Sequence, residues 1–173
     1  YRQQLLASTG LVFRGQGSEF DEATVHQGSP TDIALGRALG KATEVARRCP
    51  GALIIGADQV LEESGQVYGK VATKEAACQR LLDLAGKTHR LLSAYCLVSQ
   101  RGDQVEIIHQ DVVSVTMTMR PVEPLEVEAY VENFCEWQGV VGCYQYENAG
   151  VNLFSQIDGD HSSIIGLPLT PLL

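Results

Sequence analysis

The sequence predicts an α/β protein in which a mixed, twisted sheet is flanked by helices. Two observations support this fold class: extended segments alternate with helical ones, and the neighbouring strand segments 88–99 and 104–119 are joined by Arg101-Gly102-Asp103. Such a short connection makes these strands antiparallel, because a parallel pair needs a long crossover. With 173 residues and 45% apolar content, one domain, residues 1–173, accounts for the chain.

Local signals place the first helices. Residues 1–7 resemble the end of a helix that stops at Gly10, and a short extended piece is expected around Val12. Ser29-Pro30-Thr31-Asp32 then predicts a helix start, since serine is a good cap, proline suits the first turn, and Asp32 completes a capping box. This helix should run to about Arg48.

Two ionisable residues in this part of the chain are unusual. The apolar run 52–57 predicts a buried strand that ends in one carboxylate, Asp58, where packed aliphatic neighbours restrict hydration. The alternative is an aspartate that merely caps the following turn. Lys41 lies on the apolar stripe of the preceding helix, where it either extends its ammonium to water or directs a cation into a cleft.

The same reasoning predicts the remaining elements. In order, they are a turn at Ser64-Gly65, an extended segment Val67 to Lys70, a helix 73–85 ending at Gly86, the two strands, a helix introduced by Pro121 and Pro124 that runs to about Asn133, a glycine- and aromatic-rich segment 137–150, a strand 151–157, a Gly159-Asp160 turn and a closing Gly166-Leu167-Pro168.

Charge and cysteine content exclude several classes of protein. Acidic residues outnumber basic ones by 21 to 13, giving a formal charge of −8 without a basic run, so nucleic-acid polymers and anionic membranes are not expected partners. The apolar stretches are too short to cross a bilayer and no leader is recognisable, which indicates a soluble, cytoplasmic protein. The five scattered cysteines fit reduced thiols of that compartment: Cys49, Cys78, Cys96, Cys135 and Cys143.

Common catalytic motifs are missing from the sequence. The four histidines are isolated from one another and from the cysteines, and there is no Gly-x-Ser-x-Gly elbow, Walker loop or dinucleotide fingerprint. What remains is a set of acids and lysines: Glu22, Lys41, Asp58 and Lys70. Such a set suits a phosphate ester that arrives with a divalent ion.

Short motifs in this chain resemble those of the Maf-type nucleoside triphosphate pyrophosphatases. They follow one another in the family's order over nearly the whole chain: Glu22 after Asp21, Lys41 in Ala-Leu-Gly-Lys-Ala, Gly-Ala-Asp-Gln-Val at 56–60, Gly69-Lys70, Leu84-Ala85-Gly86-Lys87-Thr88-His89, Gly159-Asp160 and Gly166-Leu167-Pro168-Leu169.

The resemblance implies two lobes around a deep cleft, a divalent cation (Mg²⁺ or Mn²⁺), and hydrolysis between the α- and β-phosphates of a nucleoside triphosphate. By the same resemblance Asp58 is the general base, Lys41 and Lys70 hold phosphate oxygens, and Glu22 is a metal-binding or water-orienting carboxylate. A homodimer is a further family-based expectation.

Three positions resemble the branch of the family that acts on 7-methyl-GTP, which has an aromatic residue, Gln and Glu where the dTTP/UTP branch has Arg, Thr and Gln. Here they are Tyr1, Gln59 and Glu147. An aromatic face favours the cationic methylated base by about 0.5–2 kcal/mol, and a glutamate accepts from the guanine N–H edge. Gln59 would present its amide to the same base. The alternatives are a frayed terminus, a turn residue and a solvated acid.

The sequence also departs from the family. The family places a Ser-x-Ser-Pro turn ahead of the position of Tyr1, so we expect that residues precede Tyr1 in the active protein. Arg2 matches the arginine that closes this turn and is expected to reach a phosphate. Segment 136–141 lacks the family's usual run, which leaves its role open.

Two other functions remain open at this stage. One is a nucleotide-binding regulator of cell division or septum formation that does not turn its ligand over. The other is an inosine-triphosphate-type enzyme of similar architecture, which shares the reaction but not these motifs.

Overall fold

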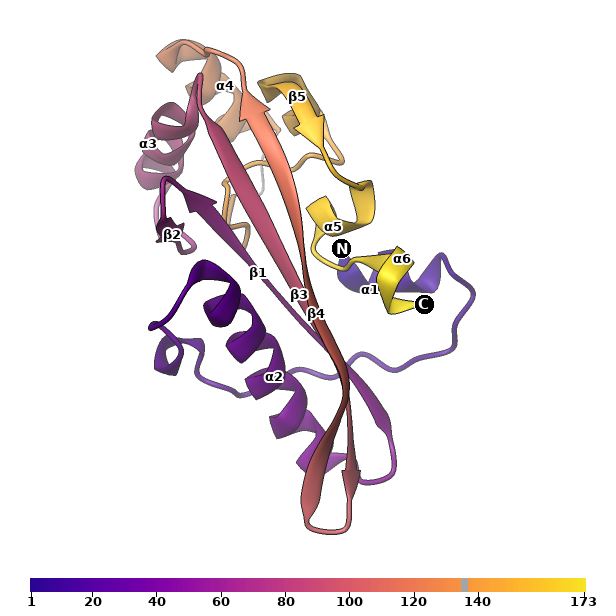
Figure 1. Cartoon of the computed structure of the whole chain (residues 1–173). Helices are drawn as coiled ribbons and strands as arrows, with labels where there is room; N and C mark the ends of the chain where they lie inside the picture. Colours follow the sequence, from indigo (N-terminus) through magenta and orange to yellow (C-terminus); the bar gives the residue numbers. More distant parts are fainter. Residues whose placement is uncertain (135–136) are drawn as a thin grey trace. The chain divides into compact units, whose positions relative to one another are not determined.

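The computed structural model describes residues 1–134 and 137–173. Cys135 and Glu136, the latter the first residue of segment 136–141, lie outside the described residues. The α-helices and strands are labelled in Figure 1. In chain order, the elements are α1 (Arg2–Ala7), the 3₁₀ helix η1 (Glu22–Thr24), α2 (Pro30–Arg48), β1 (Leu53–Glu63), β2 (Gln66–Tyr68), α3 (Lys74–Leu84), β3 (Thr88–Arg101), β4 (Gln104–Met119), α4 (Pro124–Asn133), the 3₁₀ helix η2 (Ala149–Leu153), β5 (Phe154–Asp158), α5 (His161–Ile165) and α6 (Leu169–Leu172).

The strands form one five-stranded sheet in the order β2-β1-β3-β4-β5. Both outer pairs are antiparallel: Leu61 of β1 lies opposite Tyr68 of β2, and Met117 of β4 lies opposite Ile157 of β5. The predicted α/β class, a sheet with flanking helices, is confirmed.

The chain divides into two compact units. The first comprises residues 1–59, 92–113 and 160–173, and the second comprises residues 60–91 and 114–159. The cleft that the family resemblance implies stays a prediction.

In the first unit, helix α2 packs directly on strand β1. The helix begins as predicted: Ser29 Oγ accepts from the Asp32 backbone N–H at 3.2 Å, and the Asp32 carboxylate accepts from the Ser29 backbone N–H at 2.9 Å. Its buried face consists of Ile33, Ala34, Ala38, Ala42, Val45 and Ala46. At Gly56 of β1, a Cβ would lie 2.5 Å from Ala42 Cβ and 2.7 Å from Ala38 O, so only glycine permits this approach.

In the second unit, helices α3 and α4 contact each other. The β1–β2 hairpin turns at Ser64 and Gly65, both in the left-handed region with φ of 53° and 84°, as the turn prediction required. His89 is buried among aromatic rings, and its Nε2 lies 2.7 Å from the Tyr144 hydroxyl. Burial lowers the pKa of His89 to about 4.

Strand β1 does not end at residue 57, as the sequence reading expected. It continues through Asp58 to Glu63, and its last residues pair with β2. The prediction was wrong because a charged residue normally ends a buried strand, whereas this carboxylate receives a cation from α2, as described below.

The segment around Val12, expected to be a short extended piece, lies outside the helices and strands, and the Val12 side chain is fully exposed. One other strand prediction was also wrong. Strand 151–157 is replaced by η2 and a shorter β5. The cause is a tight turn in which the backbone N–H groups of Asn148 and Gly150 both donate to Gln145 O at 3.1 Å, which leaves 149–153 helical.

Candidate active site

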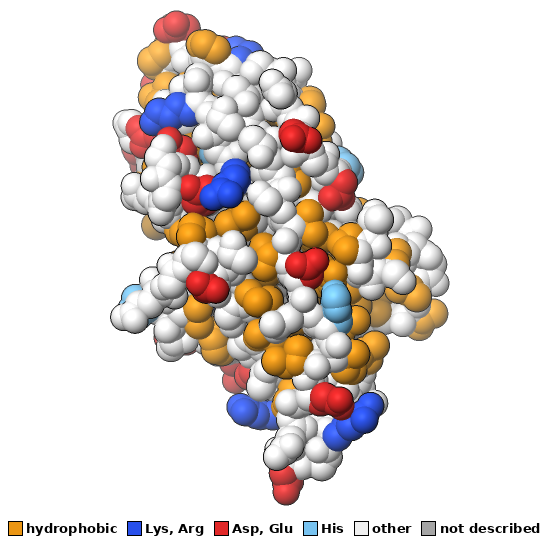
Figure 2. Space-filling view, viewed as in Figure 1, with side chains coloured by type: hydrophobic (Ala, Val, Ile, Leu, Met, Phe, Trp, Pro, Cys, Tyr) orange, Lys and Arg blue, Asp and Glu red, His pale blue; other side chains and the backbone are white. Residues whose placement is uncertain are grey.

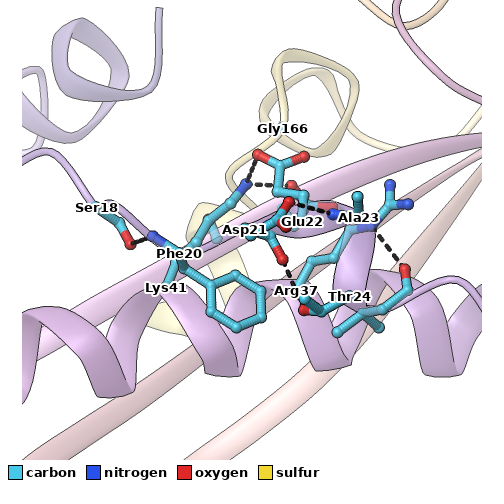
Figure 3. Close-up of polar contacts among 12 residues, drawn as sticks. Ser18, Phe20, Asp21, Glu22, Ala23, Thr24, Arg37, Lys41 and Gly166 are labelled. Carbon is cyan, nitrogen blue, oxygen red and sulfur yellow. Dashed lines mark hydrogen bonds and ion pairs between the residues drawn. The ribbon is translucent and has the colours of Figure 1, made fainter.

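Lys41 joins two carboxylates from distant parts of the sequence. Its Nζ lies 2.6 Å from Asp58 Oδ1. It also lies 2.7 Å from Glu22 Oε1, and Figure 3 labels Lys41 and Glu22. The three residues come from α2, β1 and η1, all within the first unit. The exposed fractions of the side chains are 20% for Lys41, 7% for Asp58 and 39% for Glu22, so the lysine points into an ion-pair cluster rather than to open water.

Two glycines on α2 position the segment that carries Glu22. Gly36 and Gly40 are four residues apart and therefore lie on the same side of the helix. A Cβ at Gly40 would lie 2.3 Å from the Phe20 ring, and a Cβ at Gly36 would lie 2.9 Å from Val25 Cγ1. Phe20 and Val25 thus pack against bare helix backbone on either side of Glu22 in the sequence.

Polar contacts fix the same segment, and Figure 3 shows them along α2. Asp21 caps η1 by accepting from the Ala23 backbone N–H at 3.0 Å, and Arg37 Nε donates to Val25 O at 3.2 Å. Glu22 therefore reaches Lys41 from a short helix that is held at both ends.

Asp58 has one paired and one unpaired oxygen. The residue is 5% exposed, and Oδ1 accepts from Lys41, whereas Oδ2 is buried without a hydrogen-bond partner among the described residues. Buried polar atoms are nearly always satisfied, so an orphaned carboxylate oxygen indicates a position meant for a ligand, a water or an ion. Asp58 is thus a strand residue and not a turn cap.

Arg2 adds a second cation beside this cluster. Its Nε donates to Gly166 O at 2.9 Å, and one terminal nitrogen donates to Ala57 O at 3.2 Å. Burial lowers the pKa of the Arg2 guanidinium from its ordinary value, while the charges of Asp58 and Glu22 act in the opposite direction. Two cations and two carboxylates therefore lie close together in the first unit.

Gln59 follows Asp58 but makes contacts of a different kind. Its Nε2 lies 2.8 Å from Ser93 Oγ and 3.0 Å from both Ser163 O and Ile164 O. These acceptors lie on β3 and α5. Asp160 is the N-cap of α5, and its carboxylate accepts from the Ser163 backbone N–H at 3.0 Å and from the hydroxyls of Ser162 and Ser163.

The pKa of Asp160 is lower than usual despite its partial burial. Burial acts to raise it, but the hydrogen bonds from Ser162 and Ser163 outweigh this effect. The carboxylate that caps α5 is therefore charged at neutral pH, and its hydrogen bonds fix the first turn of this helix.

The remaining predicted site residues, Tyr1, Lys70 and Glu147, come from other parts of the chain. Tyr1 caps the N-terminus of α1 and is 51% exposed. Lys70 and Glu147 belong to the second unit, and both side chains are exposed. Their contributions to a site stay predictions.

The carboxylates of the cluster are suited to a divalent cation that also binds water and phosphate. Among residues 1–134 and 137–173, no group of three or more His, Cys, Asp or Glu side chains is arranged to hold a metal ion alone. Mg²⁺ does not need such a group, because it typically takes one or two carboxylates and completes its shell with water and phosphate oxygens. Glu22 and the orphaned Asp58 Oδ2 fit this requirement.

The helices, cysteines and basic side chains of the structure concern the classes of protein that were not expected from the sequence. In the described part of the chain, no helix is long and apolar enough to cross a membrane. The four cysteines described are thiols rather than disulfides. On the face drawn in Figure 2, Lys and Arg side chains stand apart from one another and form no broad basic patch.

Sequence reasoning missed the residues that support the cluster. Ser93 is fully buried, and the signal for it was a single hydroxyl within the apolar run Leu91-Leu92-Ser93-Ala94-Tyr95-Cys96. The pair Gly36 and Gly40, which lowers helix propensity at two positions of α2, was a signal for close packing.

Comparison with known proteins shows which family the chain resembles over its whole length. The family described as Maf-like protein matches residues 1–173. The chain is 40% identical over its full length to a 7-methyl-GTP pyrophosphatase of Bartonella quintana (strain Toulouse), of which it covers 88%. It is 41% identical over 99% of its length to a nucleoside triphosphate pyrophosphatase of Nitrobacter hamburgensis, of which it covers 86%.

Proposed function

The chain belongs to the Maf-like family, and on that premise we propose that it is a nucleoside triphosphate pyrophosphatase that hydrolyses 7-methyl-GTP to the monophosphate and pyrophosphate. Relatives about 40% identical over the whole chain bear the names of these activities. Within the structure, the observation that supports hydrolysis best is the buried Asp58 with one oxygen paired to Lys41 and the other unpartnered.

In the proposed reaction, Asp58 Oδ2 accepts a proton from a water molecule while the water oxygen attacks the α-phosphorus. The bond between that phosphorus and the α,β-bridging oxygen breaks, and its electron pair leaves with pyrophosphate. Lys41 binds Asp58 through Oδ1, and this contact fixes the orientation of the carboxylate and therefore the direction in which Oδ2 points. General-base catalysis of this kind is usually worth roughly 10²–10⁴-fold in rate.

The ammonium of Lys41 has three N–H donors and meets two carboxylates, so one donor can contact a phosphate oxygen, and release of a carboxylate would leave a second donor for the phosphate. Glu22 is the better candidate for release, because 39% of its side chain is exposed whereas that of Asp58 is 7% exposed. The released Glu22 would then help to hold the divalent cation, Mg²⁺ or Mn²⁺, while Asp58 Oδ2 stays available as the base. When bound, that cation neutralises phosphate charge and favours departure of pyrophosphate. Lys70 is proposed as a further phosphate-binding cation, and the charge of Arg2 adds to the same field.

The preference for a methylated guanine is assigned to Tyr1 and Glu147. The exposed ring of Tyr1 offers a face to a cationic base. The exposed carboxylate of Glu147 offers acceptors to the guanine N–H edge, which a pyrimidine lacks. Gln59, which follows Asp58 on β1, is proposed to present its side-chain amide to the same base. We place this activity in the cytoplasm, in a protein that forms homodimers.

The experiment uses the full-length protein with a panel of 7-methyl-GTP, GTP, dTTP and UTP, with Mg²⁺ or Mn²⁺, and measures pyrophosphate release. We expect the highest kcat/KM for 7-methyl-GTP and a loss of roughly 10²–10⁴-fold in Asp58→Asn. Asp103→Asn, in the exposed β3–β4 turn, is the matched control and should keep full activity.

Two results would contradict the proposal. Equal turnover of dTTP and 7-methyl-GTP would remove the assigned preference. Tight binding of these nucleotides in calorimetry, without pyrophosphate release under any of these conditions, would instead support the regulator of cell division.

A further inference from the structure

Arg80, on helix α3, joins two loops of the second unit. Its Nη1 donates to Val141 O at 2.8 Å and to Gly69 O at 3.1 Å. All three residues lie within the ranges 60–91 and 114–159 that make up this unit. The nitrogen carries two hydrogens, so each carbonyl receives a hydrogen bond of its own. Arg80 thus links the segment that follows β2 to the segment that follows α4.

An aromatic ring restricts the same guanidinium. Its central carbon lies over the ring of Tyr68, the last residue of β2, at 4.5 Å from the ring centroid. An arginine placed over an aromatic face gains a cation–π contact, and its planar fork keeps the N–H groups in fixed directions. The ring and the two carbonyls together leave little freedom to the half-buried Arg80 side chain.

The segment that follows Val141 is anchored in the core. The Tyr144 side chain is 3% exposed, and its hydroxyl lies 2.7 Å from His89 Nε2. The backbone N–H of Gln145 donates to the Tyr130 hydroxyl at 3.0 Å. These contacts hold the chain within four residues of the carbonyl that the arginine meets, so that carbonyl is a fixed point.

The other loop has less support of its own. Residues 69–73 lie between β2 and α3, outside the helices and strands. Gly69 and Lys70 are both exposed, and a Cβ at Gly69 would meet nothing within 4 Å, so packing contributes little here. Gly69 O belongs to the peptide group that joins this residue to Lys70. The hydrogen bond from Arg80 therefore limits where the backbone of Lys70, and with it the ammonium, lies.

We propose that Arg80 is a positioning residue that fastens the backbone before Lys70 to the fixed segment 141–145, so that the Lys70 ammonium is directed to the phosphates of the substrate. This inference rests on the proposed function, since Lys70 is assumed there to bind phosphate. Arg80 acts through Lys70, and Lys70 meets a part that all triphosphates share. Loss of Arg80 should therefore weaken the binding of every triphosphate alike, whatever its base.

The test compares wild type, Arg80→Met, Lys70→Met and the double variant on 7-methyl-GTP, GTP and dTTP, at a temperature where circular dichroism shows each protein fully folded. We expect Arg80→Met to raise KM about tenfold for all three nucleotides, with the ratios of kcat/KM between nucleotides unchanged within about twofold. Lys70→Met should lower kcat/KM about a hundredfold. The double variant should match Lys70→Met within about twofold, because Arg80 acts only through Lys70.

The single tryptophan of the chain, Trp137, gives a second readout that needs no nucleotide. The backbone N–H of Val140 donates to Trp137 O at 3.4 Å, so the indole belongs to the turn directly before Val141. Without the arginine this turn loses a contact and should open more readily. We expect Arg80→Met to raise the acrylamide quenching constant of Trp137 about twofold, whereas Lys70→Met should leave it unchanged.

Controls separate positioning from charge and from general loss of stability. Arg101→Met removes the same charge from a side chain that is 75% exposed, and should leave the kinetic constants and the quenching unchanged. Arg80→Lys keeps the charge but not the planar fork, and should recover only part of the wild-type KM. Should Arg80→Met fail to fold, Arg80→Lys and Tyr68→Leu, which removes the ring under the guanidinium, supply the same comparison.

The inference is overturned if the effects of Arg80→Met and Lys70→Met multiply in the double variant, since Arg80 would then contact the substrate independently. It is also overturned if Arg80→Met keeps the wild-type KM or the wild-type quenching, if it changes the 7-methyl-GTP to dTTP ratio tenfold or more, if Arg80→Lys recovers KM fully, or if Lys70→Met keeps the wild-type constants. A wild-type protein that hydrolyses none of the nucleotides refutes the proposed function instead, and the quenching of Trp137 still tests the link made by Arg80.

Discussion

Replacing Lys41 with methionine is the sharpest test of the ion-pair cluster. Methionine has nearly the length of lysine and retains its apolar contacts, so the change removes mainly the ammonium. Asp58, 5% exposed and already lacking a partner at Oδ2, would then lose the cation at its other oxygen. Glu22 would lose the same partner at the more exposed side of the cluster.

The expected cost follows from the burial of each partner. Removing one member of a buried ion pair costs about 3–5 kcal/mol. Because 20% of the Lys41 side chain is exposed, the lower end applies, about 3 kcal/mol. The half-exposed Glu22 adds less than about 1 kcal/mol. For a chain of this length, the loss lowers Tm by roughly 6–12 °C.

The assay is urea unfolding of four proteins: wild type, Lys41→Met, Asp58→Asn and the double variant. Asp58→Asn removes the charge but keeps a hydrogen-bonding oxygen, so we expect a loss of about 1–2 kcal/mol. In the double variant no buried charge is left unpaired on β1, and the cycle should give a coupling free energy of about 1–3 kcal/mol. Lys74→Met, which breaks the exposed pair with Glu132, is the control and should cost less than about 1 kcal/mol.

The reasoning is refuted if Lys41→Met is no more destabilising than Lys74→Met and the cycle is additive within about 0.5 kcal/mol. Lys41 would then extend to water, and the electrostatic basis for placing Asp58 in the strand would be lost.

Three further predictions concern packing, metal dependence and pH. Gly56→Ala should destabilise by about 1–3 kcal/mol in urea unfolding, because its Cβ would meet Ala38 O at 2.7 Å, whereas Gly17→Ala, with nothing within 4 Å, should have little effect. Glu22→Gln should raise the Mg²⁺ concentration for half-maximal activity about tenfold, with less than about 1 kcal/mol of destabilisation. An unchanged Mg²⁺ requirement would show that Glu22 does not bind the cation. Burial lowers the pKa of His89 from 6.5 to about 4, so the unfolded chain takes up the proton first, and stability, complete above pH 6.5, should fall by about 1.4 kcal/mol per pH unit toward pH 4. His89→Gln should lack this contribution, so the difference in unfolding free energy between wild type and His89→Gln should show the slope, and a difference that is constant between pH 4 and pH 6.5 would refute it.

Elements governed by local interactions could be predicted from the sequence. The start of α2 is an example, since the Ser29–Asp32 box consists of hydrogen bonds between residues three apart. The β3–β4 turn is another, because Gly102 adopts the left-handed conformation that its position between two strands demanded. The sequence also singled out Lys41 and Asp58, since ionisable groups next to apolar residues are uncommon, and the resemblance to the Maf family added Glu22.

What no local pattern could decide is which of these groups meet. Asp58 lies within a strand only because Lys41, 17 residues earlier, brings it a charge, so the length of β1 depends on a contact with α2. The contacts of Gln59 with Ser163 O and Ile164 O, more than 100 residues away, became visible only in the folded chain. The sequence therefore determined the chemical groups and the helices and turns that carry them. Tertiary structure decided how charges and hydrogen bonds are shared, because a buried polar group is stable only with a partner that the fold supplies.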